Sequence, residues 1–144
     1  MFFRVIALLV FVSFALHLAW EFSHYRLYTG YENLSTLPIY VWATIGDVLY
    51  TLVAFTLASL FKRGLGWVRE AAIPDYVGLA ALGFFIALYV EYKAVAFQRW
   101  VYLPEMPIIP MFDVGLSPVM QMVILLPLTV FVVSFIEKRL GTVI

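Results

Sequence analysis

The chain has 144 residues, nine Lys and Arg against nine Asp and Glu, and no cysteine; 65% of its residues are hydrophobic and 12% are charged. A soluble domain is roughly half apolar and about a quarter charged, so this composition excludes one. The balanced charge predicts no nucleic-acid partner, and the absence of cysteine excludes a disulfide framework and thiolate metal or redox chemistry.

Four long apolar segments predict four transmembrane helices. A helix needs about 20 mostly apolar residues to cross roughly 30 Å of hydrocarbon. The predicted spans are residues 2–23, 37–61, 76–97 and 114–136. The first lacks a convincing small-residue cleavage site and is predicted to be retained. The sequence therefore predicts an all-α fold, an integral membrane four-helix bundle formed by one domain over residues 1–144.

The loops predict the orientation of these helices. Basic residues favour the cytoplasmic side. Six lie beside the termini and in the middle loop, namely Arg4, Lys62, Arg63, Arg69, Lys138 and Arg139. Three lie toward the other side, namely Arg26, Lys93 and Arg99. Both termini are predicted to be cytoplasmic, in the inner membrane of a bacterium, and Trp67 is expected in the inner aromatic belt.

The outer segment between the third and fourth spans is rich in proline, which restricts its backbone. The prolines are Pro104, Pro107, Pro110 and Pro118. We expect this segment to fold over the outer mouth of the bundle as a lid or shallow re-entrant stretch; a rigid connector is the alternative. Both outer loops also follow a helix ending in an acid and an aromatic cluster (Glu21 to Tyr28, and Glu91 to Tyr102), a similarity too weak to define a repeat.

Three acids lie within or beside the predicted spans, where ionisable groups are costly and usually functional. Asp47 lies about 15 Å below the start of its span and Glu91 about 9 Å from the outer end of its helix, by a rise of 1.5 Å per residue. Glu21 lies closest to the outer interface. All three are therefore expected in the outer half of the bilayer.

The spacing of polar and small residues predicts which helix faces point inward, since residues four apart share a side. The three rows are Ser13, His17 and Glu21 with His24 beyond; Ala43, Asp47 and Thr51; and Gly83, Ala87, Glu91 and Val95. The fourth span adds Ser117 and Gln121. These rows predict an outward-facing cavity between the helices.

The preferred interpretation is an acidic and aromatic pocket for a hydrophobic small molecule or lipid. A carboxylic acid removed from water can donate or shuttle a proton near neutral pH, so acid–base chemistry on the ligand is compatible with this site. The candidate catalytic residues are Asp47, Glu91 and Glu21. The candidate ligand-binding residues are His24, Tyr50, Arg99, Trp100, Tyr102 and Gln121. No motif specifies a reaction.

Two alternatives remain open at this point. The polar rows would equally suit a non-catalytic structural or assembly subunit, as a homo-oligomer or within a larger membrane complex. Glu21-x-x-His24 also has the spacing of metal-binding elements in helical bundles. A transition metal would then take ligands from His17, Glu21, His24, Asp47 and Glu91. No cofactor is predicted otherwise.

The motifs also support a resemblance. Trp20-Glu21, Gly46-Asp47, Glu91, Trp100-Val-Tyr102, Met106-Pro107 and Gly115-Leu-Ser-Pro118-x-x-Gln121 together resemble a set of small bacterial four-helix membrane proteins without an established activity. Architecturally, the chain is also similar to the sigma-2 receptor and sterol-isomerase group, in which intramembrane acids line a lipid-sized pocket. That similarity implies lipid binding by analogy of fold only, since no motif of the group matches here.

Overall fold

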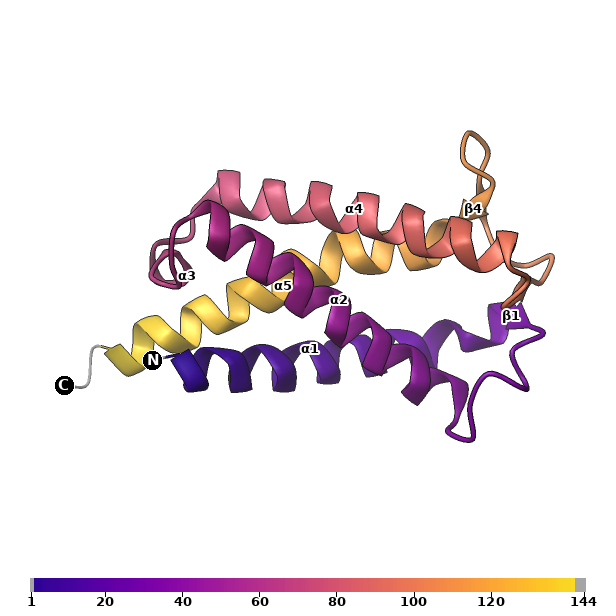
Figure 1. Ribbon diagram of the computed structural model, residues 1–144, viewed down its shortest axis with the longest axis horizontal. Helices are drawn as coiled ribbons and strands as arrows, with labels where there is room; N and C mark the ends of the chain where they lie inside the picture. The colour runs from indigo at the N-terminus through magenta and orange to yellow at the C-terminus, as the bar shows by residue number, and fades with distance from the viewer. Residues whose placement is uncertain (1, 142–144) are drawn as a thin grey trace.

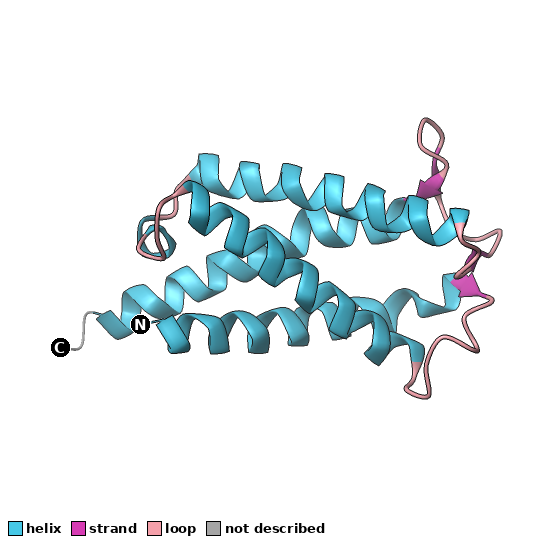
Figure 2. Ribbon diagram, viewed as in Figure 1, coloured by secondary structure: helices cyan, strands magenta, loops and turns pink. Residues whose placement is uncertain are grey.

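The computed structural model describes residues 2–141 and is dominated by helices (Figures 1 and 2). The helices are α1 (Phe2–His24), the 3₁₀ turn η1 (Tyr25–Leu27), α2 (Ile39–Phe61), α3 (Trp67–Glu70), α4 (Ile73–Ala96) and α5 (Leu116–Gly141). The strands are β1 (Tyr28–Thr29), β2 (Val101–Tyr102), β3 (Ile108–Ile109) and β4 (Val114–Gly115).

The four long helices α1, α2, α4 and α5 are each long and apolar enough to cross a membrane. This confirms the four predicted apolar spans, with boundaries that differ by a few residues, and indicates a membrane protein. The third helix begins earlier than predicted, so Pro74 lies in its first turn, where a missing N–H costs nothing. The Asp75 carboxylate accepts a hydrogen bond from the Ala72 N–H at 3.1 Å and caps this end.

Figure 1 shows the two ends of the chain and α3 at one end of the molecule, called here the terminal end. The opposite end, which carries the four strands, is called the distal end. Helix α5 packs against α4, α1 and α3, and α2 packs mainly along α1. Helix α2 has few contacts with α4, and the two ribbons diverge toward the distal end (Figure 1).

An apolar core fills the terminal half of the molecule. Its buried members are Val5, Leu9, Ala54, Phe55, Trp67, Val68, Leu79, Leu126, Val130 and Val133. Trp67 is part of this core, because α3 folds back against α5 and buries the side chain; its predicted place on the inner side of the membrane stays a prediction. The Trp67 ring packs 5.6 Å from Phe55, and its N–H donates to the Ser59 hydroxyl at 3.0 Å.

The distal end contains two short antiparallel strand pairs that the all-α prediction missed, since strands of two residues have no readable hydrophobic period. Strand β1 pairs with β2, which places Tyr28 opposite Tyr102. Strand β3 pairs with β4, with Ile109 opposite Val114. The β3–β4 hairpin projects beyond α4 on the side away from α1 (Figure 1), and Phe112 at its tip packs 5.9 Å from Phe84 of α4.

Candidate functional site

A cavity of about 450 Å³ lies in the distal half of the bundle, between α1, α2, α4 and α5. Acidic side chains from three helices line it: Glu21 from α1, Asp47 from α2 and Glu91 from α4. Aromatic rings form much of the wall, namely Tyr25, Tyr28, Tyr31, Trp42, Tyr50 and Trp100. The remaining lining residues are mostly apolar, so the acids face a water-poor space.

The cavity reaches the side of the molecule between α2 and α4. Leu49 and Val53 line the cavity from α2, yet their side chains are 59% and 51% exposed. Ile86 and Val90 line the facing side of α4. Because Val53 is about 21 Å along α2 from its start, this opening extends beyond the middle of the helix. Its apolar rim would meet lipid rather than water if the helices cross a bilayer.

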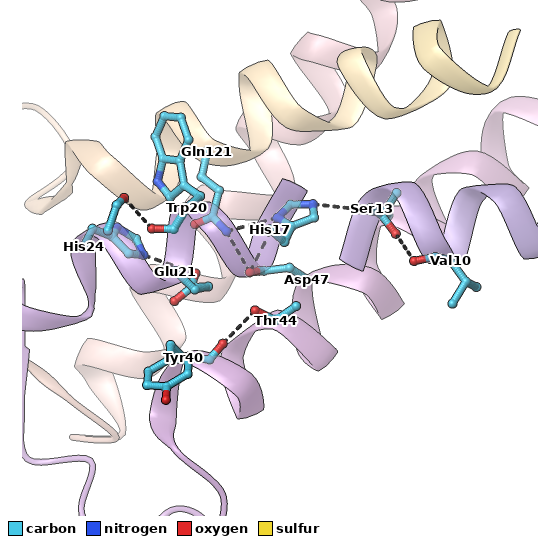
Figure 3. A network of polar contacts seen from close by, with 12 residues as sticks. Val10, Ser13, His17, Trp20, Glu21, His24, Tyr40, Thr44, Asp47 and Gln121 are labelled. Atoms are coloured by element: carbon cyan, nitrogen blue, oxygen red, sulfur yellow. Dashed lines mark hydrogen bonds and ion pairs between the residues drawn. The ribbon is translucent and has the colours of Figure 1, made fainter. Parts of the chain in front are cut away.

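Asp47 is held by a chain of hydrogen bonds that crosses three helices (Figure 3). The Gln121 amide nitrogen lies 2.8 Å from the Asp47 carboxylate and 3.0 Å from Nδ1 of His17. An amide nitrogen only donates, so Nδ1 accepts and the ring proton of His17 lies on Nε2. That nitrogen is 3.2 Å from the Thr51 hydroxyl. The chain orients Asp47 toward the cavity and fixes α1, α2 and α5 relative to one another.

Glu21 lies beside Asp47 and is supported from behind by His24 (Figure 3). Nε2 of His24 is 3.2 Å from the Glu21 carboxylate, and Nδ1 is 2.7 Å from the Ser117 hydroxyl of α5. Residues 21 and 24 share a helix face because they are three apart. Glu21 lines the cavity, whereas His24 lies behind it.

Glu91 receives two hydrogen bonds from the segment that follows α4. The Tyr102 hydroxyl donates to Oε2 of Glu91 at 2.5 Å, and the Trp100 indole N–H donates to the same oxygen at 3.3 Å. Strand pairing with β1 holds Tyr102 in place, and the Tyr28 ring packs 5.8 Å from Tyr102 and 6.1 Å from Trp100. The aromatic clasp (Tyr28, Trp100 and Tyr102) thus closes the distal end above Glu91.

The phenols of this clasp stay protonated. Burial raises the pKa of both Tyr28 and Tyr102, and the negative charge of Glu91 raises each pKa further. A protonated phenol is a hydrogen-bond donor. Tyr102 therefore remains a donor to Glu91 throughout the neutral and mildly alkaline range.

The structure brings most of the sequence-predicted site residues to this cavity. Those that line it are Glu21, Asp47, Tyr50, Glu91, Arg99, Trp100 and Gln121. Tyr102 and His24 act one step behind, as partners of Glu91 and Glu21. Of the proline-rich segment, Arg99, Trp100 and Pro118 line the cavity, while its β3–β4 hairpin lies beside α4.

The predicted site residues did not include Tyr28, which the sequence placed in the aromatic cluster of the first outer loop. The paired pattern of acid and aromatic cluster in the two outer loops was the available signal, since these clusters form the β1–β2 pair. The predicted site residues also did not include Gly46, although it lines the cavity. A Cβ added at this position would have no other atom within 4 Å.

A buried carboxylate at the terminal end was missed entirely. Glu137 of α5 is fully buried and binds two arginines. Arg4 of α1 lies 2.6 Å from Oε1, and Arg69 of α3 lies 3.0 Å from Oε2. The arginines partly face solvent, with 44% and 39% of their side chains exposed. This network is far from the cavity and ties α1, α3 and α5 together.

The metal hypothesis gains no geometric support. Among residues 2–141, no group of three or more His, Asp and Glu is placed to hold a metal ion. Both ring nitrogens of His17 contact Gln121 and Thr51, so this ring has no nitrogen left to offer a metal. Comparisons with protein-family models, curated proteins and solved structures found no match to the chain. The resemblance to small bacterial membrane proteins and to the sigma-2 group stays a prediction.

Proposed function

We propose that this protein binds a hydrophobic small molecule or lipid in the distal cavity, with Asp47, Glu91 and Glu21 as the polar groups that orient it. The observation that carries the proposal is the convergence of three carboxylates from three helices on one largely apolar cavity. Its volume of about 450 Å³ is in the range of small-molecule sites. A polar network that only fixed helix packing would have no need of such a space.

The surroundings of the acids also suit acid–base chemistry on the bound molecule. Glu91 accepts a short hydrogen bond from Tyr102 and a longer one from Trp100, whereas Asp47 lies beside Glu21 and accepts one amide hydrogen bond. Carboxyl groups in different environments can take different protonation roles. Binding is the core of the proposal, and any proton transfer would use this pair of environments.

The proposed orientation places both termini in the cytoplasm and the distal cavity in the outer half of a bacterial inner membrane. The loop charges support it, because six basic residues lie at the terminal end. The chain has no cysteine, so single cysteines at Glu32 and Arg63 give a clean test in intact cells. A membrane-impermeant thiol reagent should label Glu32→Cys and spare Arg63→Cys; the reverse pattern would invert the topology.

The binding proposal is tested by filling the cavity. Gly46→Leu places a side chain at the cavity, and its Cβ would have no other atom within 4 Å. Gly78→Leu is the matched control: it is a helical glycine with equally open space, but at a separate cavity of the terminal half. Native mass spectrometry of gently purified protein should show a lipid-sized adduct on wild type and Gly78→Leu, lost from Gly46→Leu.

The polar anchors are tested in the same assay. Asp47→Asn and Glu91→Gln keep side-chain size and should preserve folding while lowering retention of the adduct. An adduct that persists in Gly46→Leu would place the ligand elsewhere. An adduct retained equally by both acid variants would show that the carboxylates do not orient it.

A further inference from the structure

The charge balance of the distal cavity is one-sided. Its lining includes three acids, Glu21, Asp47 and Glu91, but one basic residue, Arg99. Arg99 lies in the exposed loop after α4, where water can solvate it. Two of the acids have a histidine neighbour outside the cavity lining, His24 at 3.2 Å from Glu21 and His17 at 3.6 Å from Asp47, but no Lys or Arg forms an ion pair with them among the described residues. The interior of the cavity is therefore richer in carboxyl groups than in cations.

The hydrogen bonds that side chains donate to Glu91 and to Asp47 each fall on one oxygen of the carboxyl group. Glu91 is 5% exposed and lines the cavity, yet Trp100 and Tyr102 both donate to its Oε2. Neither of these two bonds uses Oε1 of Glu91. Likewise Gln121 donates to Oδ2 of Asp47, and the Glu21 carboxyl group lies within hydrogen-bond reach of Asp47. A ligand that supplies N–H groups from inside the cavity would add hydrogen bonds to these carboxyl groups, and a charged donor would make them stronger.

The cavity wall favours a cation as well. Rings of Tyr28, Tyr50 and Trp100 line the space beside the acids. The negative face of an aromatic ring attracts an ammonium group within about 6 Å of its centroid, most strongly where water is excluded. Acids and rings together thus complement a positively charged nitrogen.

The shape of the cavity indicates the apolar part of the ligand. From the acids, the cavity continues along Leu49 and Val53 of α2 to the lateral opening between α2 and α4. An alkyl chain fits this apolar exit, and the aromatic clasp closes the distal end above the polar groups. A molecule with a polar head at the acids and a chain in the opening would enter from the lipid phase.

From these observations, and resting on the proposed function, we infer that the ligand is an amphiphile with a protonated amine head and a single apolar chain. The amine donates to the carboxyl groups of Glu91 and Asp47, and the chain leaves between α2 and α4. The assignment excludes anionic heads as preferred ligands, because the three acids would repel them, and it ranks neutral heads below an amine, because they carry no charge to complement the acids.

Three probes with the same chain separate the head groups. Dodecylamine, dodecanol and dodecanoate are titrated at pH 7 onto delipidated protein in detergent, below their own micelle-forming concentrations, with bound probe counted by native mass spectrometry. Binding to Gly46→Leu is subtracted as partition into micelle and surface. Charge-assisted hydrogen bonds predict that dodecylamine binds roughly tenfold tighter or more than dodecanol, with dodecanoate weakest.

Acid variants then locate the preference. Glu91→Gln and Asp47→Asn should each cut the ratio of dodecylamine to dodecanol affinity by roughly tenfold. Glu105→Gln is the control, since Glu105 is an exposed acid of the same distal end outside the cavity. If one cavity variant fails to fold, the other carries the test.

The outcomes separate this inference from the proposal beneath it. Equal or tighter binding of dodecanol or dodecanoate, or an amine preference unchanged in both acid variants, overturns the amine assignment. A second outcome is that Gly46→Leu loses the copurified adduct but binds each of the three probes as wild type does. The amine assignment is then wrong, and the cavity proposal stands. If no probe binds in a way that Gly46→Leu removes, and wild type also carries no adduct that Gly46→Leu removes, both the amine assignment and the cavity proposal are wrong.

Discussion

At Gly83, α4 lies close against the backbone of α5, and replacing this residue with alanine is a direct test of the packing that shapes the cavity. A Cβ at this position would lie 2.5 Å from the Met122 carbonyl oxygen and 2.9 Å from its carbonyl carbon. Both are backbone atoms, so no side chain can rotate away. Met122 also lines the distal cavity, which links this contact to the site.

The magnitude follows from the distances. Favourable contacts between heavy atoms lie near 3.5 Å, so α4 and α5 must separate by roughly 1 Å to admit the methyl group. Overpacking of this kind costs about 1–3 kcal/mol. Replacing a helical glycine also gains up to about 1 kcal/mol in helix propensity. Gly78→Ala measures that gain alone, because nothing lies within 4 Å of its Cβ position in the same helix.

The assay is reversible unfolding in mixed micelles with rising denaturing detergent, followed by circular dichroism. Gly83→Ala should be less stable than Gly78→Ala by about 1–3 kcal/mol. It should also retain less of the copurified lipid, since Met122 moves with α5. Equal stability of the two variants would show that a Cβ at position 83 does not come within 2.5 Å of the Met122 carbonyl oxygen. The argument that α4 and α5 are closely packed at Gly83 would then be wrong.

Two further predictions concern the ends of the bundle. Glu137→Gln removes the carboxylate that binds Arg4 and Arg69, so this variant should unfold at a lower denaturant concentration than wild type. Glu70→Gln, which changes an exposed acid, should unfold at the same concentration as wild type. Equal unfolding midpoints for Glu137→Gln and wild type would show that the network adds no stability. The raised pKa of Tyr102 means that the folded protein holds a proton that the unfolded chain releases near pH 10, so stability should fall as pH rises above about 10. Tyr102→Phe should lessen this alkaline loss, and an unchanged pH profile would refute the assignment.

The sequence alone was sufficient for the spans and for one polar face. Length and hydropathy are properties of each segment by itself, so four apolar helices could be predicted without knowing their neighbours. In α1 the predicted row Ser13, His17, Glu21 and His24 is buried throughout. The last two members of this row, Glu21 and His24, are three residues apart instead of four. Because an α-helix has 3.6 residues per turn, the shorter step keeps the row on one side of the helix.

The same rule explains where the row in α4 fails. Residues four apart drift by about 40° per step, so by the third step from Gly83 the row has turned roughly 120°. Gly83, Ala87 and Glu91 are buried, but Val95 is 41% exposed and Ala94 takes its place in the interior. In α2, Asp47 and Ala43 line the cavity, as an inward row should, yet Thr44 and Val48 make the buried contacts.

Only the tertiary structure decided which groups meet. Glu137 reaches Arg4 across nearly the whole chain, and Gln121 joins His17 to Asp47 from a helix that is distant in sequence. Such pairs depend on the order and rotation of packed helices, which local periodicity does not encode. The strand pair that brings Tyr28 and Trp100 over Glu91 is likewise a long-range pairing of two-residue segments. The positions of the acids in the sequence thus determined that they lie within the apolar helices, and helix packing determined that they share one cavity.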